Sequence, residues 1–258
     1  MSIPVGDNSR LTRPMTASEI LPSAASSDVF VIVAAHNEAD RIAATLAALS
    51  DAFPGAPLWV ADDGSTDGTA VIAEAAGATV VRSERGPPRR SGGVGKGGAV
   101  TLAAREALAS IRTGGGWVAL LCDGDLGDSA AQLGPLADVV IDGDVDMAVA
   151  VFSRRVGGGL GLAVGFARWA IRRRCGLVSR APISGQRAMR ASVLERALPL
   201  AHGFGMEIGM TVDATRAGAR VGEVELDLSH RATGRTFGGF LHRGRQLIDF
   251  VRVYWTRR

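Results

Sequence analysis

The chain is poor in cysteine and in long apolar runs, and each absence excludes a class of protein. Its two cysteines, Cys122 and Cys175, form no CxxC pair and have no histidine beside them, which excludes a disulfide scaffold and a zinc finger. No stretch of about 18 uncharged apolar residues occurs, and the first residues do not combine a cationic segment with an apolar one. We therefore expect free thiols in a reducing compartment and a cytoplasmic protein that is neither secreted nor membrane-spanning.

Aromatic residues and lysine are also scarce. Aromatic side chains make up 5% of the chain, and no RNA-binding aromatic motif occurs, so no nucleic-acid partner is expected. Of the 29 basic residues, only Lys96 is a lysine. A bias towards arginine that spares one position is expected where a compact ammonium is needed, although a single lysine also survives by chance.

Acidic and basic residues are unevenly distributed along the chain. Residues 1–150 hold 10 basic and 19 acidic side chains, whereas residues 151–258 hold 19 basic and 7 acidic ones, so the formal charges of the two parts are −9 and +12. A basic second part predicts an anionic partner such as a phosphate or a lipid head group. The alternative is an arginine-rich surface without a partner.

Apolar runs and helical patterns alternate in the first part of the chain. Strands are expected at 29–35, 57–61, 78–82, 117–122 and 146–152, with helices at 38–49, 68–76, 99–112 and 130–140. This alternation predicts an α/β fold with a mostly parallel, doubly wound sheet. Residues 1–27 are rich in Ser, Pro and Ala, which predicts a flexible or loosely packed arm.

Two segments of the second part have an amphipathic pattern. Residues 160–171 are mostly apolar and run into Arg172-Arg173-Arg174, a pattern typical of a helix on a membrane surface. An ordinary core helix with a cationic C-terminus has the same pattern, and the sequence does not separate the two. Residues 237–255 form a second basic amphipathic pattern.

Acidic and polar residues follow three of the expected strands. They are Asn37-Glu38, Asp62-Asp63-Gly64-Ser65-Thr66-Asp67 and Asp123-Gly124-Asp125. Neighbouring parallel strands bring such residues to one crevice at the carboxyl edge of the sheet. Gly124 allows the backbone to turn and aim both carboxylates of Asp123 and Asp125 at one divalent metal, although an Asp-Gly turn that only closes a strand is equally compatible.

Lys96 lies in a glycine-rich stretch that ends in Gly95-Lys96-Gly97-Gly98 and would neutralise phosphate charge beside that edge. The stretch is not a P-loop, because Gly97 stands where the GxxxxGK[ST] motif needs Ser or Thr, and no GxGxxG follows the first strand. Kinase and dinucleotide-binding functions are therefore disfavoured. A carboxylate-lined crevice suits a diphosphate that a metal carries, with spare carboxylates for ribose and base.

Four motifs, in their order along the chain, resemble the nucleotide-sugar half of family 2 glycosyltransferases with a GT-A fold. They are Ala35-His36-Asn37-Glu38, Asp62 to Asp67, Gly95-Lys96-Gly97 and Asp123-Gly124-Asp125. The resemblance covers about residues 29–126. It implies that the nucleotide sugar is bound by Ala35, Asn37, Glu38, Asp62, Asp63, Ser65, Lys96, Asp123 and Gly124. It also implies a nucleotide-sugar-binding region at 28–152 and an acceptor-binding region at 153–258 of the same domain.

Three later segments resemble glucosyl-3-phosphoglycerate synthases and polyprenyl-phosphate sugar transferases. They are Ser184-Gly185-Gln186-Arg187, Gly203-Phe204-Gly205-Met206-Glu207-Ile208-Gly209 and Ser229-His230-Arg231. By this resemblance Asp125 and His230 bind Mn²⁺ or Mg²⁺, and Glu207 binds sugar hydroxyls. Catalysis is expected from Asp123, Asp125, Glu207 and Lys96.

Arginines of the second part are the expected acceptor-binding residues. We expect Arg187, Arg231 and Arg235 to bind an acceptor phosphate, and the alternative for the last two is a charged helix face. A lone histidine after a strand is more often a surface residue, and only the resemblance favours His230 as a ligand.

The expected function is transfer of a sugar from a nucleotide diphosphate sugar, UDP-linked in preference to GDP-linked, to an anionic acceptor. Polyprenyl phosphate fits the basic second part, and the protein would then contact the inner face of the membrane, as a monomer or a homodimer. A small phosphorylated acid is the alternative acceptor. It is disfavoured because residues 157–161 lack the Arg and Thr that follow this glycine stretch in glucosyl-3-phosphoglycerate synthases. A sugar nucleotidyltransferase and a non-catalytic nucleotide-sugar-binding protein remain alternatives of other classes.

Overall fold

The structure is a computed structural model that describes residues 15–17, 20, 28–83, 94–111, 116–153, 162–201 and 205–228. Its strands are β1 (Met15–Thr16), β2 (Val29–Ala35), β3 (Leu58–Asp62), β4 (Thr79–Arg82), β5 (Val118–Asp123), β6 (Met147–Phe152), β7 (Arg187–Arg190) and β8 (Val221–Leu226). Its helices are α1 (Ile42–Ala52), α2 (Thr69–Ala75), α3 (Lys96–Ser110), the 3-10 helix η3 (Gly127–Leu133), α4 (Gly134–Ile141), α5 (Leu162–Cys175), α6 (Ala191–Ala197) and α7 (Met206–Arg216).

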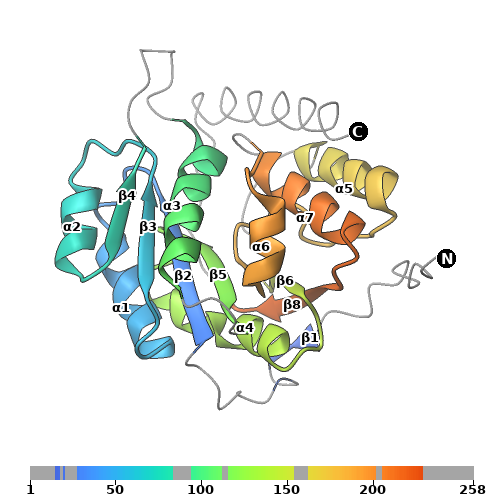
Figure 1. Cartoon of the computed structure of the whole chain (residues 1–258), viewed down its shortest axis with the longest axis horizontal. Helices are drawn as coiled ribbons and strands as arrows, with labels where there is room; N and C mark the ends of the chain where they lie inside the picture. Colours follow the sequence, from blue (N-terminus) through green and yellow to red (C-terminus); the bar gives the residue numbers. More distant parts are fainter. Residues whose placement is uncertain are drawn as a thin grey trace.

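The strands of the described residues form a single sheet with the order β1-β8-β6-β7-β5-β2-β3-β4 (Figure 1). All neighbours are parallel except β7, which runs antiparallel to both β5 and β6. The prediction of an α/β fold with a mostly parallel sheet is confirmed. Because β2 lies between β3 and β5, the carboxyl ends of these three strands are neighbours.

Both faces of the sheet are covered by helices, and the alternating side chains of β2 explain why. Val31 and Val33 pack into a core with α1 and α4, whereas Phe30 and Ile32 pack into a second core with α3, α6 and α7. All four side chains are almost completely buried, as a continuous apolar run predicts for a strand covered on both faces. Helix α5 lies outside this arrangement, where it packs on α7 (Figure 1).

Two short strands differ from the sequence expectations. Met15 and Thr16 pair with Val224 and Glu225 of β8, so part of the segment expected to be a loosely packed arm adds an edge strand to the sheet. Strand β7 was not predicted, because its sequence Arg-Ala-Met-Arg has no strand pattern of its own. Pairing with β5 and β6 supplies the hydrogen bonds that keep this segment extended, although its own sequence does not favour a strand.

Helix α3 begins at Lys96, three residues earlier than the sequence pattern predicted. Gly95, the residue before it, has a φ of 79°, a value that a side chain disfavours. Lys96 therefore occupies the first turn of a helix at the carboxyl edge. No helix in the described part of the chain has the length and apolar character needed to cross a lipid bilayer.

Candidate active site

Lys96 is held between two carboxylates that come from different elements. Its Nζ lies 2.6 Å from Oδ1 of Asp123, at the end of β5, and 3.0 Å from Oε1 of Glu207, in the first turn of α7. Burial alone would lower the pKa of Lys96, but the two carboxylates outweigh it and raise the pKa above its ordinary value. The ammonium is therefore charged, and it neutralises two acids that would otherwise repel each other.

The segment before β7 closes over this ion pair. Nε2 of Gln186 donates a hydrogen bond to Oδ2 of Asp123 at 2.8 Å, so each oxygen of this carboxylate has a partner. A Cβ at Gly185 would lie 2.6 Å from Oδ2 of Asp123 and 2.8 Å from Nζ of Lys96. Position 185 thus has no room for a side chain. Sequence reasoning assigned no role to Gly185 or Gln186, and their only signal was the polar Ser-Gly-Gln-Arg stretch.

Arg187, expected to bind the acceptor, exposes none of its side chain. Its Nε donates to the carbonyl oxygen of Ser184 at 2.9 Å, and its Nη1 donates to Oγ1 of Thr211 at 2.8 Å. Burial lowers the pKa of Arg187 to about 10, although Glu207 and Glu223 oppose that shift. Arg187 ties the 184–187 segment to α7 and exposes no side-chain surface in this structure, and its expected role in acceptor binding stays a prediction.

The Asp123-Gly124-Asp125 turn is fixed from beneath by Thr45. This buried hydroxyl donates to the carbonyl oxygen of Gly124 at 2.8 Å and accepts from the N–H of Gly127 at 2.8 Å. Gly124 also donates its N–H to the carbonyl oxygen of Ala34, at 2.9 Å. Thr45 was not identifiable from the sequence, because a threonine on the buried face of a helix resembles any core residue. The turn holds Asp125 partly exposed at the edge of the sheet.

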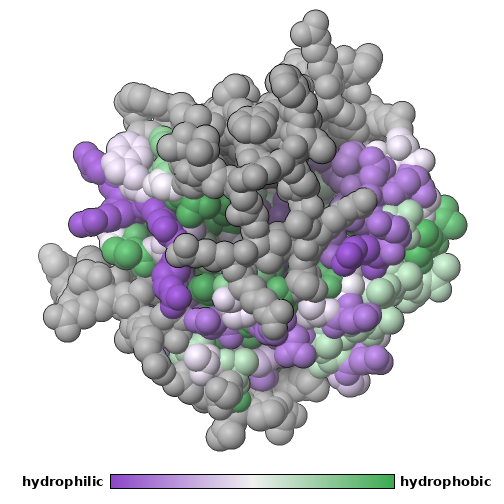
Figure 2. Space-filling view, turned by 180° about the vertical axis from the view of Figure 1, so that it is seen from behind, coloured by the Kyte–Doolittle hydropathy of each residue, from purple (hydrophilic) through white to green (hydrophobic). Residues whose placement is uncertain are grey.

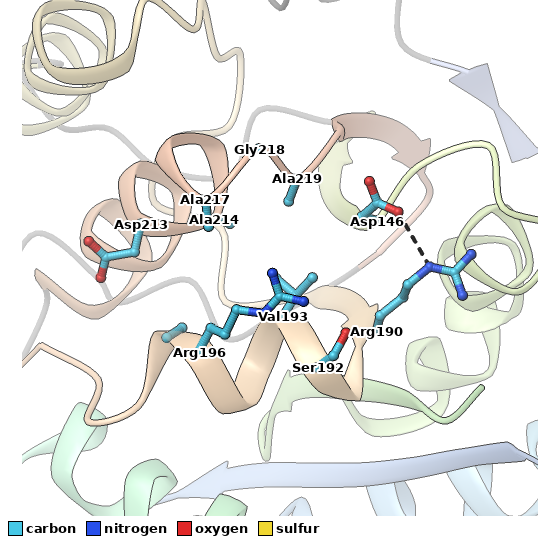
Figure 3. A pocket seen from close by; sticks show the side chains of 11 residues that line it. Asp146, Arg190, Ser192, Val193, Arg196, Asp213, Ala214, Ala217, Gly218 and Ala219 are labelled. Atoms are coloured by element: carbon cyan, nitrogen blue, oxygen red, sulfur yellow. Dashed lines mark hydrogen bonds and ion pairs between the residues drawn. The ribbon is translucent and has the colours of Figure 1, made fainter. Parts of the chain in front are cut away.

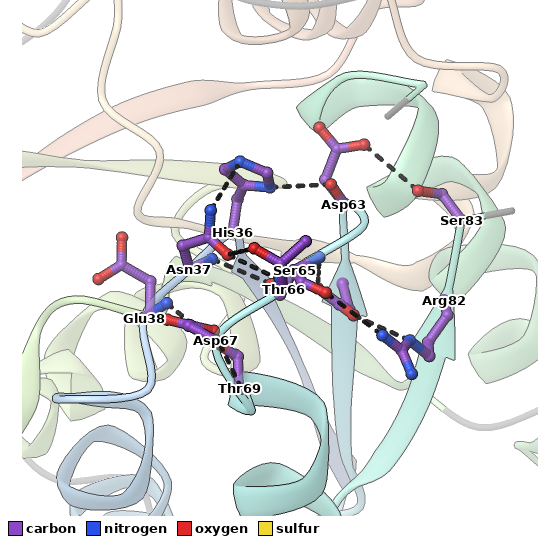
Figure 4. A network of polar contacts seen from close by, with 11 residues as sticks. His36, Asn37, Glu38, Asp63, Ser65, Thr66, Asp67, Thr69, Arg82 and Ser83 are labelled. Carbon is purple, nitrogen blue, oxygen red and sulfur yellow. Dashed lines mark hydrogen bonds and ion pairs between the residues drawn. The ribbon is translucent and has the colours of Figure 1, made fainter. Parts of the chain in front are cut away.

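The expected nucleotide-binding residues after β2 and β3 form one polar network (Figure 4). Asn37 has a φ of 58°, a left-handed conformation that asparagine tolerates better than most residues. Its N–H donates to Oγ of Ser65 at 3.0 Å, and its Oδ1 accepts from the N–H of Thr66 at 2.8 Å. The N–H of Glu38 donates to Oγ1 of Thr69 at 2.9 Å. The two strand ends are thus joined at the crevice where the sequence placed them.

Asp62 and Asp63 have different surroundings although they are adjacent. Asp62 is buried and accepts from the N–H of Ser65 at 2.9 Å and from Nε of Arg82 at 3.1 Å. Asp63 is half-buried, and its Oδ1 accepts from the N–H of Gly95 at 3.0 Å. Burial raises the pKa of Asp63, an effect that the hydrogen bond from Gly95 opposes. Asp62 therefore shapes the turn, and Asp63 links it to the start of α3.

The remaining expected site residues lie outside the described residues. These are the metal ligand His230 and the acceptor-binding Arg231 and Arg235. Within the described ranges, no group of three or more His, Cys, Asp or Glu side chains is arranged to hold a metal ion. Asp125 is thus the described member of the metal site that the sequence predicts.

A cavity of about 230 Å³ lies at the opposite edge of the sheet, near the amino end of β6 (Figure 3). Asp146, Arg190 and Arg196 line it, together with the last turn of α7. Oδ1 of Asp146 forms ion pairs with Nε of Arg190 at 3.3 Å and with Nη2 of Arg220 at 3.0 Å. Hydrogen bonds from these arginines lower the pKa of Asp146 to about 2. Since none of the expected site residues lines it, this cavity is separate from the crevice at Asp123.

We predict that Gly185→Ala destabilises the protein by about 1–3 kcal/mol, the usual cost of forcing a methyl group into a filled site. The new Cβ would displace either Asp123 or Lys96. The free energy of unfolding in urea measures the effect. Gly134→Ala is the matched control, because a Cβ there meets no atom within 4 Å. Equal stability of the two variants would contradict the close approach at Gly185.

Comparison with known proteins shows which family this chain matches. The family model described as glycosyl transferase family 2 matches residues 30–195. A glucosyl-3-phosphoglycerate synthase of Mycolicibacterium paratuberculosis is 31% identical over 241 residues, covering 81% of this chain and 70% of that protein. An undecaprenyl-phosphate mannosyltransferase of Micrococcus luteus is 30% identical over 242 residues, covering 87% of this chain and 93% of that protein.

A solved structure agrees with these similarities. The crystal structure of glucosyl-3-phosphoglycerate synthase from Mycobacterium tuberculosis, in complex with Mn²⁺, UDP-glucose and phosphoglyceric acid, has a TM-score of 0.67 and 26% identity over 94% of this chain and 85% of that chain. The expected GT-A fold is thereby confirmed, and the alternatives of other classes are disfavoured. The chain belongs to glycosyl transferase family 2.

Proposed function

We propose that this glycosyltransferase moves a sugar from a UDP-sugar to the phosphate of a polyprenyl phosphate, with the help of a divalent metal. The observation that carries the proposal is the position of Lys96 between Asp123 and Glu207, at the edge where β2, β3 and β5 end. This is where open α/β sheets bind nucleotides.

The donor half of the proposal rests on charge. A UDP-sugar brings two phosphate charges to a crevice lined by acids, so cations must accompany it. Lys96 is one such cation, and the carboxylates on either side hold it in place before the donor arrives. A charge positioned in advance stabilises a developing anion without reorganisation at the moment of reaction. Glu207 and Asp123 also offer acceptor oxygens for sugar hydroxyls.

A divalent metal supplies the remaining cationic charge. The resemblance to family 2 glycosyltransferases assigns Asp125 to the metal, whereas both oxygens of Asp123 contact Lys96 and Gln186. Together with the imidazole of His230, Asp125 forms a set of ligands that Mn²⁺ or Mg²⁺ accepts. Such metals often have few protein ligands and complete their shell with substrate phosphates and water. When bound, the metal stabilises the negative charge of the departing diphosphate.

The acceptor half rests on the basic second part of the chain. Between Asp146 and Glu195 there are nine arginines and no acidic residue. The similarity to the undecaprenyl-phosphate mannosyltransferase of Micrococcus luteus, which covers 93% of that protein, supports a lipid phosphate acceptor. A phosphate oxygen is a nucleophile at neutral pH. The reaction then needs no strong base: the acceptor oxygen bonds to the sugar C1 while the bond from C1 to the UDP oxygen breaks and UDP leaves with the electron pair.

A small phosphorylated acid is the second candidate acceptor. It is supported by the similarity to the Mycobacterium tuberculosis enzyme, whose crystal structure contains phosphoglyceric acid. Both candidates present a phosphate to the same basic part of the chain, and they differ in whether a long apolar chain is attached.

We predict that Lys96→Arg lowers kcat by about 100-fold, the usual cost of losing one preorganised donor at a developing anion. The planar guanidinium is too broad for the space between Asp123, Glu207 and Gly185. Release of UDP in the presence of Mn²⁺ measures the rate. Arg105→Lys, an exposed position on the same helix, is the matched control and is expected to keep the wild-type rate. Unchanged kinetics of Lys96→Arg would remove its proposed role.

We predict that Asp125→Asn abolishes Mn²⁺-dependent affinity for UDP and leaves the fold intact, because an amide oxygen carries no charge for the metal. Calorimetric titration of UDP with and without Mn²⁺ measures the affinity, and circular dichroism checks the fold. Asp128→Asn, an exposed carboxylate of η3, is the control that should keep the affinity. Retained Mn²⁺-dependent binding in Asp125→Asn would refute the ligand role.

We predict a glycosylated polyprenyl phosphate when the enzyme is incubated with UDP-sugars, Mn²⁺ and polyprenyl phosphate. Mass spectrometry of the lipid and aqueous fractions identifies the product. Parallel reactions contain 3-phosphoglycerate in place of the lipid, or GDP-sugars in place of UDP-sugars. A product on phosphoglycerate alone would select the second candidate acceptor. Absence of product and of nucleotide release in every reaction would overturn the transferase proposal.

A further inference from the structure

Helix α5 has an apolar inner face and a separate outward face. Ala167, Ala170 and Ile171 are buried in a small core with Ile208 and Val212 of α7. The sequence left open whether this segment packs on the core or lies on a membrane. The buried inner face shows that it packs on the core. Phe166 is partly buried against this core, whereas Trp169, on the outward face, is not part of it.

The outward face displays large apolar side chains. Trp169 is 50% exposed, and its ring lies 5.5 Å from the ring of Phe166. Val178, just beyond the helix, is 57% exposed. Nη2 of Arg168 donates to the carbonyl oxygen of Arg180 at 2.7 Å, which ties the segment after the helix to the helix itself. Contiguous apolar side chains at a surface, such as the rings of Trp169 and Phe166, often mark a binding surface.

Several arginines lie on the same helix and on the segment that follows it. We define the α5 surface as Phe166, Arg168, Trp169, Arg172, Arg173, Val178 and Arg180. Arg172 and Arg173 are exposed and, among the described residues, have no carboxylate within ion-pair distance. Nη1 of Arg180 has a carboxylate partner at a longer distance, Oε2 of Glu225 at 3.8 Å. On the side of the molecule that carries α5, Figure 2 shows hydrophilic and hydrophobic residues next to each other.

We propose that the α5 surface docks on an anionic phospholipid membrane. Tryptophan favours the boundary between head groups and acyl chains, where its ring is in an apolar medium and its N–H remains solvated. Guanidinium groups pair with lipid phosphates, and basic clusters are attracted to the negative potential of an anionic bilayer. A second copy of this chain is a poorer occupant of the α5 surface, because a symmetric contact would place arginines against arginines.

The α5 surface is connected to the crevice through α7 and through the segment that precedes β7. Helix α5 packs on α7, whose first turn carries Glu207. The segment that holds Val178 and Arg180 continues directly to Gln186, which binds Asp123. The α5 surface and the crevice are therefore connected by rigid packing and a short segment. The docking proposal does not depend on the acceptor, since it concerns binding to phospholipid alone.

Vesicle binding by the full chain tests the proposal. The probes are vesicles of phosphatidylcholine alone and of phosphatidylcholine mixed with phosphatidylglycerol, both without any polyprenyl lipid. We expect cosedimentation with the anionic vesicles only. Arg172→Glu with Arg173→Glu should weaken it at least about tenfold, because each basic residue near an anionic surface contributes to the attraction. Trp169→Ser should weaken it while leaving the net charge unchanged.

The matched control is Arg105→Glu with Arg196→Glu, which makes the same change in net charge at exposed positions of α3 and α6. It should retain most of the binding, and all variants should keep the wild-type thermal stability and UDP affinity. Absence of binding to anionic vesicles, or equal losses in the two double variants, would overturn the proposal. Binding to an RNA or DNA oligonucleotide in place of the vesicles would overturn it too. Because acceptor use is measured separately, failure here leaves the proposed transferase reaction standing.

Discussion

The ion pairs of Lys96 with Asp123 and Glu207 are the interaction on which the crevice depends. Asp123 ends a central strand, Lys96 begins a helix on one face of the sheet, and Glu207 begins another helix on the same face. Two carboxylates this close repel each other unless a cation lies between them. The ammonium therefore joins three elements that the sequence separates widely. Gly185 and Gln186 complete the arrangement, one by its lack of a side chain and the other by a hydrogen bond.

The uneven charge of the chain follows from the same arrangement. The first part places acids at the ends of β2, β3 and β5, where they suit ribose, base and metal. The second part carries the arginines, which suit an anionic acceptor and an anionic membrane. The single lysine stands where the two meet. A compact ammonium fits between two carboxylates beneath a glycine, and a planar guanidinium does not.

Several strands and motifs were predictable, and several contacts were not. The strands at 29–35 and 118–123 followed from continuous apolar runs, which only a strand buried on both faces favours. Strand β7 was not predictable, because the burial of Arg187 depends on Ser184 and Thr211, which accept hydrogen bonds from two of its three guanidinium nitrogens. The burial of Arg187 was not predictable either, because a local pattern does not reveal which arginines face inward.

The sequence by itself determined the chemistry at the carboxyl edge. Three short motifs at strand ends predicted one crevice, because parallel strands bring their ends together, and the resemblance of these motifs and of Gly95-Lys96-Gly97 to family 2 glycosyltransferases indicated a nucleotide-sugar site. Only the tertiary structure decided which contacts each of these residues makes and which of them are buried. Asp123 contacts Lys96 and Gln186, and Asp62 and Arg187 are buried. Such contacts join residues that are far apart in the chain, and no local pattern records them.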